Sequence, residues 1–189
     1  VNSNRLNGID AEFLTTEEVK SFIPILNASD SARYPVLGAS LQRRGGVARH
    51  DAVAWGFARA ADSYGVDIIQ NCEVTDIRYD NSHVIGVDTT RGFIQAERIG
   101  VAVAGNSSVL ADMVGLRLPI ETHPLQALVS EPIKPILDTV VMSHFVGAYV
   151  SQSDKGELVI GGGIDSYVGY GLRGSFSVIE PTISAIVEL

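Results

Sequence analysis

Apolar residues recur at helical spacing in two stretches of the chain. Val53, Phe57, Ala61 and Tyr64 follow one another at intervals of four, four and three residues, which predicts an amphipathic helix over 51–64. Asp51 is the expected N-cap of this helix, and Gly65 follows its end. Trp55, Arg59 and Asp62 occupy the opposite side.

The last residues predict a second helix of this kind. Ser177 and Glu180 are spaced as a capping box, Pro181 is expected in the first turn, and Ile183, Ile186 and Val187 form an apolar stripe. The stripe reaches Leu189 without a C-cap, and the chain starts at Val1 rather than at methionine. We therefore interpret the sequence as an internal fragment of a longer chain. A short helix is also expected from Thr15 or Thr16 to Phe22.

Alternating and apolar runs predict extended structure in the middle of the chain. Stretches 66–78, 84–89 and 93–96 are separated by turn residues, which indicates a three-stranded antiparallel meander. The apolar run 98–104 is typical of a strand buried on both faces. This run breaks at Gly105, and a short helix is expected from Ser107.

The pattern of apolar and polar residues changes near residue 119. Strands are predicted at 125–130, 139–142, 148–152 and 157–162, and the last two flank a hairpin turn. We expect an α+β fold with three parts: residues 1–48, residues 49–118 with the helix and the meander, and residues 119–189 with a mostly antiparallel sheet.

Composition narrows the possible functions. The 189 residues carry 14 Lys and Arg against 22 Asp and Glu, a net charge of -8, which argues against nucleic acid as a partner. No apolar run approaches the length of about 20 residues that a membrane span needs. The single cysteine, Cys72, excludes an internal disulfide, and we expect it to be buried on a strand in a cytoplasmic protein. The four histidines show no metal-ligand spacing, so no metal is expected.

A basic, glycine-containing segment leads directly into the helix predicted over 51–64. Arg43, Arg44, Arg49 and His50 lie in this segment, and a helix N-terminus attracts anions such as phosphate. The helix dipole and the arginines also favour the neutral, nucleophilic form of His50. On the residues alone, however, a solvated basic loop and a histidine bound to a nearby carbonyl are the simpler interpretations.

Several longer runs add a resemblance. The sequence resembles the β subunits of heterotetrameric sarcosine oxidases, which belong to the glycine-oxidase and D-amino-acid-oxidase group of flavoproteins. The runs that carry the resemblance extend over nearly the whole chain: Arg49-His50-Asp51-Ala52-Val53-Ala54-Trp55, Gly65-Val66-Asp67-Ile68-Ile69-Gln70, His123-Pro124-Leu125-Gln126-Ala127-Leu128-Val129-Ser130-Glu131, Lys155-Gly156-Glu157-Leu158-Val159 and Gly163-Ile164-Asp165.

This resemblance implies a domain division, a reaction and a set of cofactors. Residues 1–48 would be a substrate-domain or linker part, 49–118 a partial FAD-binding α/β domain with the meander, and 119–189 a truncated substrate-domain part. Members of the family demethylate sarcosine to glycine, and electrons pass from noncovalent FAD to covalent FMN and then to oxygen, which gives hydrogen peroxide. The histidine that carries FMN matches His50, and the FMN lies between the β subunit and the α subunit. Val74 and Gly105 match backbone positions near FAD, and we assign Arg49 to the FMN phosphate on charge and proximity. Catalytic residues stay unassigned.

The sequence departs from the family at both ends. The N-terminal βαβ unit with its glycine-rich FAD fingerprint is absent, as is the C-terminal part of the sarcosine site, so we expect the fragment alone to be inactive. Uncovered apolar strand edges could also make it self-associate. Two other functions stay open: another FAD-dependent amine or amino-acid dehydrogenase of the same group, or a non-catalytic binding module that reuses the fold.

Overall fold

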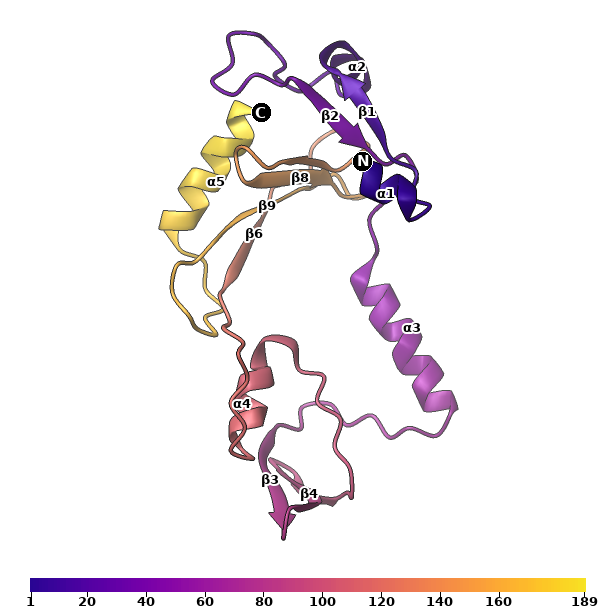
Figure 1. Ribbon diagram of the computed structural model, residues 1–189, viewed down its shortest axis with the longest axis vertical. Helices are drawn as coiled ribbons and strands as arrows, with labels where there is room; N and C mark the ends of the chain where they lie inside the picture. The colour runs from indigo at the N-terminus through magenta and orange to yellow at the C-terminus, as the bar shows by residue number, and fades with distance from the viewer. The chain divides into compact units, whose positions relative to one another are not determined.

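The computed structural model describes all 189 residues and divides them into two compact units (Figure 1). We call Val1–Val47, Pro124–Ser166 and Leu172–Leu189 the sheet unit. Ala48–His123 with Tyr167–Gly171 forms the helix–meander unit. Helices and antiparallel sheets both occur, so the α+β fold class is confirmed. The predicted functional division at 1–48, 49–118 and 119–189 stays a prediction.

A four-stranded antiparallel sheet forms the centre of the sheet unit. Its strands follow the order β6 (Leu125–Val129), β9 (Leu158–Ile164), β8 (Ala148–Gln152) and β7 (Val141–Ser143). Helix α5 (Phe176–Glu188) lies across one face of this sheet and contacts β6, β8 and β9 (Figure 1). The predicted hairpin between β8 and β9 is confirmed, because Ser153 and Glu157 pair across the turn.

The start predicted for α5 was wrong. The helix begins at Phe176 with Ser175 as N-cap, so Ser177 is not the cap and Pro181 lies inside the helix. Tertiary contacts explain the difference. Gln126 and Asp165, from β6 and the residue after β9, hydrogen-bond the Ser175 hydroxyl and so hold the chain at this point.

A two-stranded antiparallel sheet and two helices make up the N-terminal part of the sheet unit. Helix α1 (Asn2–Leu6), which the sequence pattern did not predict, precedes β1 (Glu12–Thr15), and β1 pairs with β2 (Gly38–Leu41). Helix α2 (Thr16–Phe22) begins as predicted, with a capping box between Thr15 and Glu18. Its residue Val19 is buried.

The helix–meander unit begins with α3 (His50–Ser63), whose N-cap is Arg49 rather than the predicted Asp51. The predicted meander is confirmed as β3 (Val74–Asp80), β4 (His83–Thr89) and β5 (Gly92–Gln95). A 3₁₀ turn, η1 (Ala104–Asn106), then leads into the predicted short helix α4 (Ser107–Asp112).

Two predicted strand segments of this unit are not strands. Residues 66–73 precede β3 without regular structure, and Cys72 among them is half-buried rather than buried on a strand. Residues 98–103 form no strand either, and Val101 is 51% exposed. A strand needs a neighbour for its backbone hydrogen bonds, and no other segment of these 189 residues pairs with either stretch.

Candidate functional site

His50 and Arg49 lie where α3 begins. Arg49 has extended backbone as the N-cap, His50 is the first helical residue, and both side chains are exposed. No side chain caps this end of the helix. Because the first N–H groups of an uncapped helix and its dipole attract negative charge, the α3 start suits a phosphate group.

The basic cluster predicted around His50 is divided between the two units. Arg43 pairs with Glu12, and Arg44 with Asp10, all within the sheet unit. Arg49 is therefore the arginine of the segment that shares a unit with His50. Its positive charge and its place at the helix start fit the expected role beside a phosphate.

Val74 is the first residue of β3, which is an edge strand of the meander. Backbone N–H and C=O groups at alternate positions of an edge strand point away from the sheet, so they are available to a ligand. Reciprocal bonds between Glu73 and Thr90 fix the backbone just before Val74, since the Glu73 N–H donates to the Thr90 hydroxyl and the Thr90 N–H donates to the Glu73 carbonyl.

Gly105 lies in the middle of η1, and its carbonyl accepts a hydrogen bond of 2.7 Å from the Thr122 hydroxyl. Ala104 beside it has a φ of 45°, in the left-handed region that residues with a side chain seldom adopt. A side chain at position 105 would lie 3.1 Å from the Thr122 methyl carbon. Glycine is therefore suited to this turn, and the polypeptide backbone itself forms its surface.

The structure does not bring the four predicted site residues together around one cavity. These residues are Arg49, His50, Val74 and Gly105. A cavity of about 620 Å³ in the helix–meander unit is lined by none of them. One side of α3 contributes Trp55, Ala58, Arg59 and Asp62, and residues 68–71 and Arg91 complete the lining. The sequence pattern placed Trp55, Arg59 and Asp62 on a common face but assigned them no ligand.

A second surface that the sequence analysis missed lies on the sheet unit. Met142, Tyr149, Gly161 and Ala127 are register partners in one row across the sheet. The Tyr149 ring lies over Gly161, where any side chain would collide with it. This row lies on an exposed face of the sheet, which is apolar except for the Tyr149 phenol. The neighbouring residue Ala148 is buried. The signal available in the sequence was the glycine run 161–163 together with a strand that carries a tyrosine.

Comparison with known proteins identifies the family. A sequence profile described as FAD dependent oxidoreductase (DAO) matches residues 2–189. The chain belongs to the FAD-dependent oxidoreductase family. Such proteins use FAD, and the edge-strand position of Val74 and the glycine turn at Gly105 are compatible with a bound dinucleotide.

Matches to individual proteins are more specific for this FAD-dependent oxidoreductase chain than the family profile. It is 58% identical over 189 residues to sarcosine oxidase subunit beta of Arthrobacter sp and 54% identical over 188 residues to that of Rhodobacter capsulatus. It spans 47% and 45% of these two proteins, about half their length. A solved structure of L-proline dehydrogenase from P. horikoshii superposes with a TM-score of 0.87 at 25% identity, covering 98% of this chain and 49% of that chain.

Two further findings bear on other classes of site. No three His, Cys, Asp or Glu side chains lie close enough together to hold a metal ion. None of the helices combines the length and the apolar character needed to cross a membrane.

Proposed function

We propose that the chain is part of the β subunit of a heterotetrameric sarcosine oxidase. The whole enzyme would convert sarcosine, water and oxygen to glycine, formaldehyde and hydrogen peroxide. FAD and FMN would supply the electron transfer, with the α subunit as the partner that shares the FMN, and with a cytoplasmic location. The observation that carries this proposal is 58% identity to a sarcosine oxidase subunit beta along all 189 residues.

The start of α3 is the proposed FMN attachment point. His50 is exposed in the first helical turn, the helix end has no side-chain cap, and Arg49 precedes it. Arg49 and the N-terminus of α3 are the proposed donors to the phosphate of the bound FMN. Val74 and Gly105 are the proposed contacts for FAD, both through backbone groups.

The second candidate is another FAD-dependent amine or amino-acid dehydrogenase. The fold of L-proline dehydrogenase from P. horikoshii, with its TM-score of 0.87, favours it. The identity there is only 25%, less than half of that to the sarcosine oxidase subunits. Covalent flavin on His50 distinguishes the two functions, because the resemblance ties that histidine to the heterotetrameric oxidases. A non-catalytic module would carry no flavin.

The deciding experiment is a search for covalent flavin. The full-length β subunit, co-produced with its α partner, is precipitated in acid and washed, and the His50 peptide is examined for flavin absorbance and a mass increment. We expect H50Q to lose this flavin while noncovalent FAD stays bound. H83Q is the control, because His83 is exposed at the start of β4 in the meander. Absence of covalent flavin from the wild-type complex would contradict the FMN assignment.

The 189-residue chain is the second sample in the same experiment. We propose that by itself it neither holds FAD tightly nor oxidises sarcosine, because α3 is uncovered and segments 66–73 and 98–103 have no strand partners. Such uncovered segments also favour self-association. Sarcosine-dependent peroxide production by the purified chain would overturn this part of the proposal.

A further inference from the structure

Thr122 forms hydrogen bonds in two directions within the helix–meander unit. Its hydroxyl donates to the Gly105 carbonyl at 2.7 Å, and its own carbonyl accepts from the Gly169 N–H at 2.8 Å. The first bond reaches the turn that the proposed function places against FAD. The second reaches Tyr167–Gly171, the segment after β9 that packs with this unit.

The turn around Gly105 needs such support. Ala104 adopts a left-handed backbone conformation, which is unfavourable for a residue with a side chain. The Ser107 hydroxyl donates to the Ala104 carbonyl at 2.6 Å, so two consecutive carbonyls of the turn are held by hydroxyl groups. Ser107 follows Ala104 by only three residues, whereas Thr122 comes from a distant segment of the chain. Thr122 therefore sets where the turn lies in the unit.

We propose that Thr122 is a positioning residue for bound FAD. Its hydroxyl fixes the carbonyl of Gly105, and its methyl group packs where a side chain at position 105 would otherwise lie. A backbone surface that binds a cofactor must keep its geometry to within about 0.5 Å, so losing one tether weakens binding without any loss of direct contact. This inference rests on the proposed function, in which Gly105 approaches FAD.

The test uses the full-length β subunit in complex with its partner subunits. T122V keeps the shape of the side chain and removes the hydroxyl, whereas T122S keeps the hydroxyl and removes the methyl group. T16V is the matched control, because the half-buried Thr16 hydroxyl also donates to a backbone carbonyl, that of Val36 at 2.9 Å, but in the sheet unit. The readouts are the FAD dissociation constant of the apoprotein and the visible circular dichroism of bound flavin.

We expect T122V to raise the FAD dissociation constant about five- to tenfold and to change the flavin dichroism, as the loss of one hydrogen bond predicts. The separate variant T122S should give about wild-type values of both readouts, and T16V should leave both unchanged. If T16V and T122V weakened FAD binding alike, the cause would be a general loss of stability, and the proposal would be overturned. Wild-type behaviour of T122V would also overturn it.

A second pair of variants covers the case in which T122V does not fold. G105A introduces a methyl group 3.1 Å from the Thr122 methyl carbon and should weaken FAD binding. Adding T122S makes room for it, so the double variant should recover part of the affinity. No recovery would contradict the positioning role. A wild-type complex without FAD would instead refute the proposed function itself, and this inference with it.

Discussion

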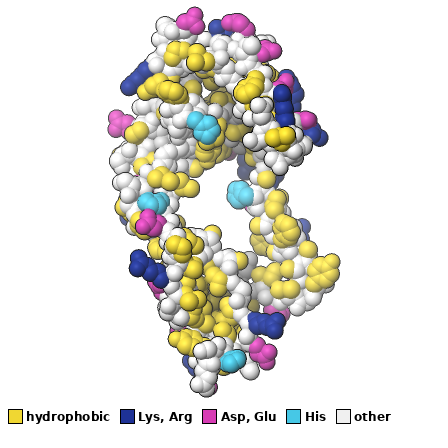
Figure 2. Space-filling model, viewed as in Figure 1, with side chains coloured by type: hydrophobic (Ala, Val, Ile, Leu, Met, Phe, Trp, Pro, Cys, Tyr) yellow, Lys and Arg dark blue, Asp and Glu magenta, His cyan; other side chains and the backbone are white.

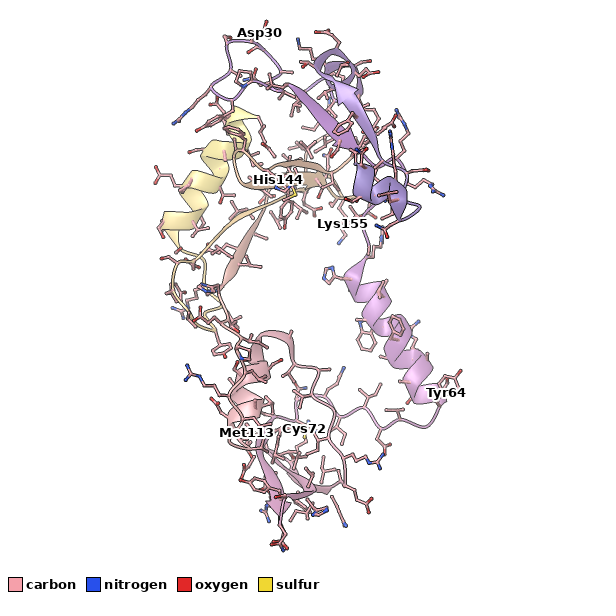
Figure 3. All side chains as sticks on the ribbon, in the orientation of Figure 1. Asp30, Tyr64, Cys72, Met113, His144 and Lys155 are labelled. Carbon is pink, nitrogen blue, oxygen red and sulfur yellow. The ribbon has the colours of Figure 1, made fainter.

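Two helices with apolar stripes of similar spacing, α5 and α3, have opposite surroundings in this chain. Helix α5 covers the four-stranded sheet and buries Thr182, whereas α3 buries no residue. Phe57 on the apolar stripe of α3 is 75% exposed, and Tyr64 at its end is 88% exposed (Figure 3). Figure 2 shows hydrophobic side chains uncovered along this helix. Periodicity indicates which side of a helix needs a cover, but not whether the cover lies in the same 189 residues.

Polar contacts reinforce the difference. Asp165 is 4% exposed and accepts hydrogen bonds from Gln126 at 2.7 Å and from Ser175 at 3.0 Å. This network ties α5 to β6 and β9. Neither helix has a side-chain cap at its start, so the difference lies in the bonds that join Ser175 to the sheet. The helix whose N-cap residue is bound to the sheet is structural, and α3 is the helix that we propose binds a cofactor.

The largest expected effect tests whether the cover of α3 lies in the rest of the full-length subunit. F57A should change the free energy of unfolding of the 189-residue chain by no more than about 0.5 kcal/mol, because Phe57 is mostly exposed there. In the full-length subunit the same change should cost about 3 kcal/mol, the usual penalty for a buried Phe. Urea unfolding measures both values, followed in the 189-residue chain by the fluorescence of Trp55, its single tryptophan. Equal small losses in the two proteins would show that α3 stays uncovered.

The next effect concerns the anchor of α5. D165A removes the acceptor for Gln126 and Ser175 and leaves their donors unpaired in a partly buried site. We expect the sheet unit to lose about 2 kcal/mol in its free energy of unfolding. Far-UV circular dichroism in urea measures this, with the exposed Asp30 as control through D30A. A loss no greater than that of D30A would mean that the network does not hold α5.

A smaller effect is expected at the start of α2. T15A removes the hydroxyl that accepts from the Glu18 N–H, and loss of such a cap costs about 1 kcal/mol. T15S keeps the hydroxyl and should stay near wild type in the same urea titration. If T15S lost as much stability as T15A, the methyl group rather than the cap would be responsible.

The smallest effect is a pH dependence at the same cap. Hydrogen bonds from the Thr15 backbone N–H and hydroxyl hold the pKa of Glu18 below its usual value. A lowered pKa in the folded state stabilises above the pKa of the unfolded chain, and this contribution disappears as the pH falls through the folded value. E18Q should therefore lose less stability than wild type between neutral pH and about pH 3. Parallel pH profiles of the two proteins would contradict this.

Short-range signals predicted much of the fold. The start of α2 at Thr15 or Thr16, the meander turns and the hairpin before β9 all depend on residues close in sequence, and each lies where its pattern indicated. His50 at the start of a helix was equally predictable. The strands expected at 66–73 and 98–103 failed because a strand exists only with a paired neighbour, and apolar composition cannot supply one.

By itself, the sequence determined the local turns, most of the helical and extended segments, and the position of His50 beside Arg49 at a helix start. The tertiary structure decided what those segments contact. It selected Ser175 rather than Ser177 as the start of α5, covered α5 but not α3, and brought Thr122 to the carbonyl of Gly105. The physical reason is that caps and turns are satisfied within a few residues, whereas burial and long-range hydrogen bonds require a second segment whose position no local pattern encodes.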